Sequence, residues 1–203
     1  MKTTILSIAT VLLIIFSIST SGFAASKATG AQTVLNDVAN ISQIEVHGNV
    51  ELFVSTGETE NVKVYDSYYS QNALVQEQDG VLRISSFKAE KLVVWVTVNQ
   101  LQSISAYDNA EVKSFGKLST IDFSLNLNNN ATAKLDLDVS DATIALNGNA
   151  KASLSGYADE SYIELSQAAK VNTAKFAATV HVKKHTPIVM AAQVDADELI
   201  GVN

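Results

Sequence analysis

Residues 144–152 read Ile-Ala-Leu-Asn-Gly-Asn-Ala-Lys-Ala, and variants of this nine-residue stretch recur along the chain. The other four copies begin at Ile44, Ile104, Leu125 and Ile163, so the last four copies are 21, 19 and 19 residues apart. A period near 20 residues built from short strands is typical of solenoids. The repeat therefore predicts an all-β fold, a right-handed parallel β-helix (β-solenoid) with coils of about 19–21 residues.

Apolar residues occupy fixed positions in every copy. The first and third positions are aliphatic, and the seventh is Val or Ala. Because strand side chains alternate between the two faces, the first and third positions share one face. We expect them to stack inward as columns formed by Leu125, Leu127, Ile144, Leu146, Ile163 and Leu165.

The fifth and sixth positions of the repeat are small or amidic. The fifth is Gly48, Asp108, Asn129, Gly148 and Gln167. The sixth is Asn49, Asn109, Asn130, Asn149 and Ala168. Gly and Asn tolerate a left-handed backbone, so both positions predict a tight corner on each coil.

Strand patterns continue outside the repeats. Period-two alternation covers residues 44–54 and resumes at Val62 and Val64. Asp79-Gly80 predicts a hairpin turn that leads into a strand over residues 81–85. The run Leu-Val-Val-Trp-Val-Thr-Val at 92–98 is the most apolar of the mature chain, and we expect it to be buried on both faces or nearly so.

The first 24 residues have the features of an export signal. Lys2 precedes an apolar run over residues 5–18, and Gly22-Phe23-Ala24 is a small-x-small cleavage site. We expect cleavage there, although an uncleaved N-terminal anchor is the alternative. The predicted organisation is a signal peptide at 1–24, a linker or first strand at 25–40, and one β-solenoid domain at 41–203. The protein is then exported to the periplasm, the outer cell surface or the extracellular space, with no stable membrane span after cleavage.

Composition excludes several classes of partner and chemistry. The formal net charge of -7 disfavours nucleic acid, which needs a basic surface. The chain has no cysteine, which rules out disulfides, thiolate metal sites and a lipid-anchored N-terminal cysteine.

Three features together resemble a known family. They are the signal peptide, the opening Ile-x-Val-x-Gly-x-Val-x-Leu at residues 44–52, and the later Gly/Asn-Ala repeats. The chain resembles the head GIN domain family, also called DUF2807, over about residues 40–185. Members of that family are described as auto-transporter adhesins of bacterial envelopes, so the resemblance implies an adhesin-like role. Gln167-Ala168 at the fifth corner and the tail 189–203 depart from the family pattern.

The sequence predicts no catalytic, metal or cofactor site. His181 and His185 share a strand face but lie about 13 Å apart, too far for one metal ion. Asp136, Asp138 and Asp141 lack the glycine-rich nonapeptide of calcium-binding β-rolls. No Ser/His/Asp arrangement stands out, and Arg83, the single arginine, lies outside the repeats.

Two groups of polar residues are candidates for a ligand or partner surface. The first is the tyrosine cluster Tyr65, Tyr68 and Tyr69, which stacks on a sugar, docks a partner, or covers the open end of the solenoid. The second is a flat face formed by Asn109, Asn130, Asn149, Lys151 and Lys170.

We therefore expect a non-enzymatic secreted or envelope binding protein whose partner is an unknown glycan or envelope protein. Two alternatives remain open: a structural or regulatory envelope protein that acts through protein–protein contacts, and a polysaccharide lyase or hydrolase.

Overall fold

A computed structural model describes residues 32–35, 38–65, 72–166 and 168–185. These residues form twelve strands and almost no helix, so the predicted all-β class is confirmed. The strands are β1 (Gln32–Leu35), β2 (Gln43–His47), β3 (Val50–Thr56), β4 (Asn61–Tyr65), β5 (Ala73–Gln78), β6 (Val81–Ser86), β7 (Leu92–Val98), β8 (Ser103–Ala106), β9 (Glu111–Leu127), β10 (Thr132–Leu146), β11 (Lys151–Ser166) and β12 (Lys170–His185). Within the described part of the chain, no helix is long and apolar enough to cross a membrane.

The strands form one strongly curled mixed sheet. Strands β9 to β12 stack in parallel, as do β2 with β6 and β8, and β3 with β7 and β9. By contrast, β1 pairs antiparallel with β4, β4 with β7, and β5 with β6. The prediction of a wholly parallel β-helix is therefore not confirmed, because antiparallel strands close one end of the sheet.

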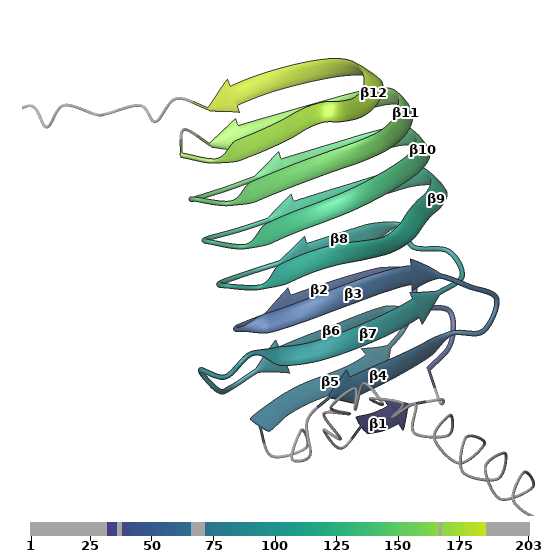
Figure 1. Cartoon of the computed structure of the whole chain (residues 1–203). Helices are drawn as coiled ribbons and strands as arrows, with labels where there is room; N and C mark the ends of the chain where they lie inside the picture. The colour runs from purple at the N-terminus through teal and green to yellow at the C-terminus, as the bar shows by residue number, and fades with distance from the viewer. Residues whose placement is uncertain (1–31, 36–37, 66–71, 167, 186–203) are drawn as a thin grey trace, which may run out of the picture.

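The order of the strands explains why the simple solenoid prediction was too regular. The coil formed by β2 and β3 lies between the β6–β7 pair and β8–β9, although β6 and β7 come later in the chain than β3 (Figure 1). Ile44 pairs in register with Ile104, 60 residues further on. The segment between β3 and β8 therefore forms the β5 end of the stack, and the chain then crosses to the other side of the β2–β3 coil at β8.

Strand β9 shows how the sheet curls around its core. Its first residues, Glu111–Ser114, pair with β3, whereas its last residues, Ser124–Leu127, pair with β8. The bend is repeated in β10, which pairs with β9 on both sides of a register shift between Lys134 and Asp136, and in β11, which pairs with β10 (Figure 1). The inner face of the curled sheet thus encloses the apolar side chains.

The predicted inward columns are confirmed. Leu125, Ile144 and Ile163 are register partners, and Ile104 and Ile44 extend the same column. All six predicted column residues are at most 6% exposed: Leu125, Leu127, Ile144, Leu146, Ile163 and Leu165. The period-two interpretation of the repeats is therefore correct.

The predicted corners are confirmed as well. Gly48, Asp108, Asn129 and Gly148 all have positive φ, between 60° and 84°. Gln167, the fifth predicted corner, lies outside the described residues. The hairpin at Asp79-Gly80 is also confirmed, with φ of 54° and 79° between antiparallel β5 and β6.

The apolar run of β7 corrects one prediction. Leu92, Val94, Val96 and Val98 are buried, but the residues between them are only half-buried. The strand therefore buries one face, and its outer face carries Trp95. The sequence was misleading because two of the three outward residues, Val93 and Trp95, are themselves apolar.

Candidate functional site

The corner residues of successive coils form a ladder of amide side chains. Asn130 Nδ2 donates to Asn109 Oδ1 at 3.3 Å, and Asn149 Nδ2 donates to Asn130 Oδ1 at the same distance. All three side chains are exposed. Each amide in the middle of such a ladder uses one N–H and one oxygen lone pair, which leaves a second N–H and lone pair for solvent or a ligand.

Two further columns flank this ladder. In one, Asn129 Nδ2 donates to Asp108 Oδ1 at 3.1 Å, and in the other Asn147 Nδ2 donates to Asn128 Oδ1 at 3.2 Å. The left-handed backbone at Asp108 and Asn129 turns these side chains outward together. The corners of β8–β9, β9–β10 and β10–β11 therefore present a regular two-dimensional array of six amides and one carboxylate, the amide corner: Asp108, Asn109, Asn128, Asn129, Asn130, Asn147 and Asn149.

The predicted lysines adjoin the amide corner, but Tyr65 does not. Lys151 and Lys170 are exposed register partners at the starts of β11 and β12, next to the corner. Tyr65, at the end of β4, is 41% exposed and lies in the same row across the sheet, five strands from Lys151. That separation is about 24 Å at roughly 4.8 Å per strand. Tyr68 and Tyr69 lie outside the described residues.

An ion cluster occupies the same row between Tyr65 and the lysines. Lys113 Nζ lies 2.7 Å from both Glu51 Oε1 and Glu111 Oε1, and Lys91 Nζ lies 3.0 Å from Glu111 Oε2. Hydrogen bonds from Lys113 and then Lys91 lower the pKa of Glu111, and hydrogen bonds to Glu111 and Glu51 raise the pKa of Lys113. The cluster is satisfied internally, and its solvent exposure limits each pair to about 0.2–1 kcal/mol.

Three aromatic rings lie beside the ion cluster. Phe53 and Trp95 stack with centroids 4.5 Å apart, and Phe115 tilts against Trp95 at 5.7 Å. Lys113 Nζ lies 5.5 Å from the centre of the Phe53 ring. Phe53 covers one face of Trp95, so the group packs the outer faces of adjacent strands against each other.

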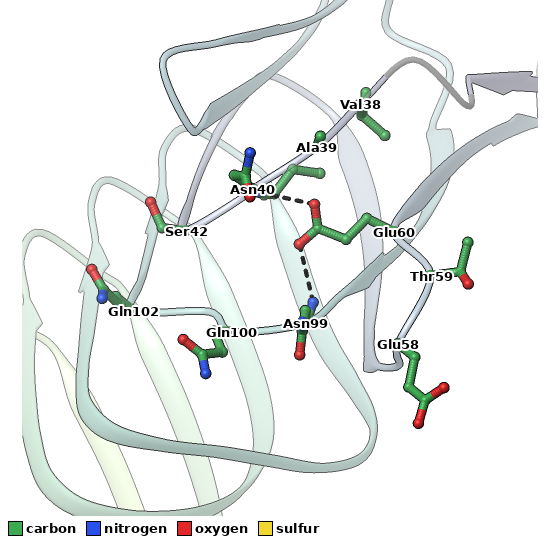
Figure 2. A pocket seen from close by; sticks show the side chains of 11 residues that line it. Val38, Ala39, Asn40, Ser42, Glu58, Thr59, Glu60, Asn99, Gln100 and Gln102 are labelled. Atoms are coloured by element: carbon green, nitrogen blue, oxygen red, sulfur yellow. Dashed lines mark hydrogen bonds between the residues drawn. The ribbon is translucent and has the colours of Figure 1, made fainter.

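A polar pocket of about 570 Å³ lies at the junction of three segments (Figure 2). Glu60 fixes its wall, since Oε2 accepts from the Ile41 backbone N–H and Oε1 from that of Asn99, both at 3.1 Å. Amides and hydroxyls make up most of the remaining polar lining: Asn40, Ser42, Thr59, Asn99, Gln100 and Gln102. These groups form hydrogen bonds but supply no nucleophile–base pair.

The histidines and aspartates considered for metal binding are dispersed. The His181 ring stacks on Tyr162 at 4.9 Å, and Asp138 lies 3.8 Å from Lys117. Among the residues that the structure describes, no three His, Asp or Glu side chains are arranged to hold a metal ion. Tyr162 donates to Glu160 at 2.7 Å, which raises the pKa of the phenol.

Sequence comparison identifies the family. Residues 40–186 match the family model DUF2807, described as "Putative auto-transporter adhesin, head GIN domain". The chain belongs to this DUF2807 family. The resemblance noted in the repeats is thus confirmed over nearly the same residues. Comparison with curated proteins finds no match.

Solved structures share the DUF2807 chain's fold at low sequence identity. A putative adhesin from Bacteroides fragilis NCTC 9343 has a TM-score of 0.67 at 14% identity, covering 76% of this chain and 75% of that one. A putative adhesin from Parabacteroides merdae ATCC 43184 has a TM-score of 0.58 at 17% identity, covering 76% and 77%. A putative lipid binding protein from Parabacteroides distasonis ATCC 8503 has a TM-score of 0.59 at 8% identity, covering 75% and 77%.

Sequence reasoning missed the ion cluster and the pocket for different reasons. Glu51 and Glu111 both occupy the eighth position of the repeat, as Lys151 and Lys170 do, so aligning the copies would have revealed that row. The pocket combines residues 38–42, 58–60 and 99–102, which share no periodic pattern. No signal in the sequence marks their proximity.

Proposed function

We propose that this member of the DUF2807 family is an exported, non-enzymatic adhesin-like protein that binds a glycan at the amide corner. In this proposal the parallel coils formed by β2, β3 and β6 to β12 serve as a rigid solenoid-like scaffold. The observation that carries the proposal is the unbroken ladder Asn109–Asn130–Asn149 with its two flanking columns.

The chemistry of the corner suits a polyhydroxylated ligand. Amide side chains donate and accept hydrogen bonds, as sugar hydroxyls do, and the amides recur at the spacing of the strands, about 4.8 Å. Each contact is weak because water competes for it. Several equal contacts on one rigid surface add up to useful affinity, since the scaffold orders the amides before the ligand arrives.

A glycan array with the full chain tests the proposal. Replacing Asn109, Asn130 and Asn149 together by Ala is expected to reduce binding at least tenfold and to leave the far-UV circular dichroism spectrum unchanged. The matched control replaces Ser103, Ser124 and Thr143 by Ala, since these residues form an outward column on the same coils, away from the corner. Equal binding by the asparagine variant and the wild type would overturn the proposal.

A further inference from the structure

Strand β12 is an edge strand of the sheet in the part of the chain that the structure describes. It pairs with β11, and no second strand lies against it among the described residues (Figure 1). An edge strand presents a row of N–H and C=O groups that can pair with another strand. At 16 residues, β12 offers a long edge of this kind.

The charge of β12 is opposite to that of the protein. The strand contains four lysines and two histidines and no Asp or Glu, in a chain whose formal net charge is -7. Only one of these lysines has an acidic partner within 4.0 Å among the described residues: Lys183 lies 3.5 Å from Glu164 on β11. A strand that adds to this edge therefore meets a concentrated positive potential.

The last five described residues before His185 show which side chains such a strand would need. Val180, Val182 and Lys184 continue the inward columns, in register with Ser161, Ile163 and Leu165 of β11. Val180 is 38% exposed and Val182 54%, so both still offer apolar surface. His181 and Lys183 face outward. The matching strand carries apolar residues opposite the valines and acidic residues opposite the lysines.

We propose that the free edge of β12 binds an extended acidic segment of a partner protein by β-augmentation. The main chain of the segment extends the parallel stack, and the alternating side chains select the partner. This inference goes beyond the amide corner, from which it is independent. Pairing of β12 with the β12 strand of a second copy is disfavoured, because it would bring together two strands that each carry four lysines and no acidic residue.

The test uses the full chain and the capped nine-residue peptide Val-Glu-Val-Glu-Val-Glu-Val-Glu-Glu, whose last two residues place carboxylates opposite both Lys183 and Lys184. Fluorescence anisotropy is expected to show saturable binding that weakens as salt is raised, and hydrogen exchange is expected to slow at β12 amides in the complex. Lys183→Glu with Lys184→Glu is expected to weaken binding at least tenfold. The neutral pair Lys183→Gln with Lys184→Gln gives a smaller loss and covers the case in which charge reversal beside Glu164 impairs folding.

The control pair is Lys88→Glu with Lys134→Glu, two exposed lysines outside β12 that change the net charge by the same amount. It is expected to bind the peptide within about twofold of the wild type, because long-range attraction is screened beyond about 10 Å.

A charge-matched peptide with prolines in place of the valines cannot complete a ladder and is expected not to bind. Equal binding of the proline peptide would show that the surface attracts acidic peptides without forming a hydrogen-bonded ladder. That result would overturn the proposal of strand addition. Absence of binding by the valine–glutamate peptide, or dimerisation through β12, would overturn it as well.

Discussion

Leu146 and Asn147 are neighbours in the chain that face opposite directions, and their replacement by alanine measures the register of the stack. Leu146 is fully buried between its register partners Leu127 and Leu165. Asn147 is exposed, and its side chain makes one hydrogen bond, to Asn128. A shift of one residue would exchange their environments.

The structure sets the expected magnitudes. Leu146→Ala removes roughly three carbon groups from the core, which costs about 2.4 kcal/mol in transfer free energy. Ladder bonds such as Asn147 N–H to Leu127 C=O, at 2.8 Å, hold the coils apart and hinder collapse of the cavity. The cavity therefore adds roughly 1–2 kcal/mol, so we expect a total loss of about 3.5–4.5 kcal/mol. Asn147→Ala loses one exposed hydrogen bond and is expected to cost about 0.5 kcal/mol or less.

Urea unfolding followed by circular dichroism measures both values. The midpoint of Leu146→Ala is expected to fall clearly, and the midpoint of Asn147→Ala is expected to stay close to that of the wild type, with similar m-values for all three proteins. Equal losses from the two substitutions, or a larger loss at Asn147, would refute the assignment of faces and with it the stacked columns.

Three further predictions follow from other features. Gly148→Val is expected to destabilise the fold more than Gly116→Val, because both glycines have positive φ, whereas only at Gly148 would a Cβ meet backbone, at 2.9 Å; thermal melting of the two variants compares them. Glu160→Gln is expected to lower the pKa of Tyr162, because the carboxylate that stabilises the neutral phenol is lost; a difference titration by ultraviolet absorbance measures it. Residues 1–24 are expected to be absent from the native protein, and mass spectrometry of its N-terminus would contradict this by finding them intact.

Features that depend on the repeat could be predicted from the sequence. A single alignment of the copies placed Ile144 and Leu146 in the core and Asn129 and Gly148 at left-handed corners. The physical reason is that equivalent positions of each coil must meet the same structural requirements. An inward position must be apolar, and a corner must accept positive φ, so the requirement is visible in every copy.

The antiparallel end of the sheet could not be predicted in this way. Strands β4 and β7 pair antiparallel, and β7 lies beside β3 although 35 residues separate Thr56 from Leu92 along the sequence numbering. Such non-local pairing leaves no periodic trace, because each strand there has a different neighbour. The same limit applies to the outer face of β7, where Trp95 is kept partly covered by Phe53, a contact set by pairing rather than by hydropathy.

The same distinction between repeat-dependent and topology-dependent features applies to the candidate site. The column Asn109–Asn130–Asn149 was predictable, because one position of the repeat generates it. The distance between Tyr65 and Lys151 was not, since it depends on how many strands the returning chain inserts between them. Repeat register thus predicts what lies along a column, whereas topology decides which columns are close together.

The two ends of the stack differ in the side chains that lie at the end of the inward columns. At the β5 end, antiparallel strands contribute Leu35 and Val75, which pack against the core, so the end is closed by apolar contacts. At the β12 end, the inward column that runs through Leu146 and Leu165 continues to Lys184. Lys184 is the register partner of Leu165, which is only 6% exposed, and a lysine can lie along an apolar surface while its amine stays in water. An inward charge of this kind blocks indiscriminate addition of apolar strands, and it leaves the edge open to a strand that supplies a carboxylate.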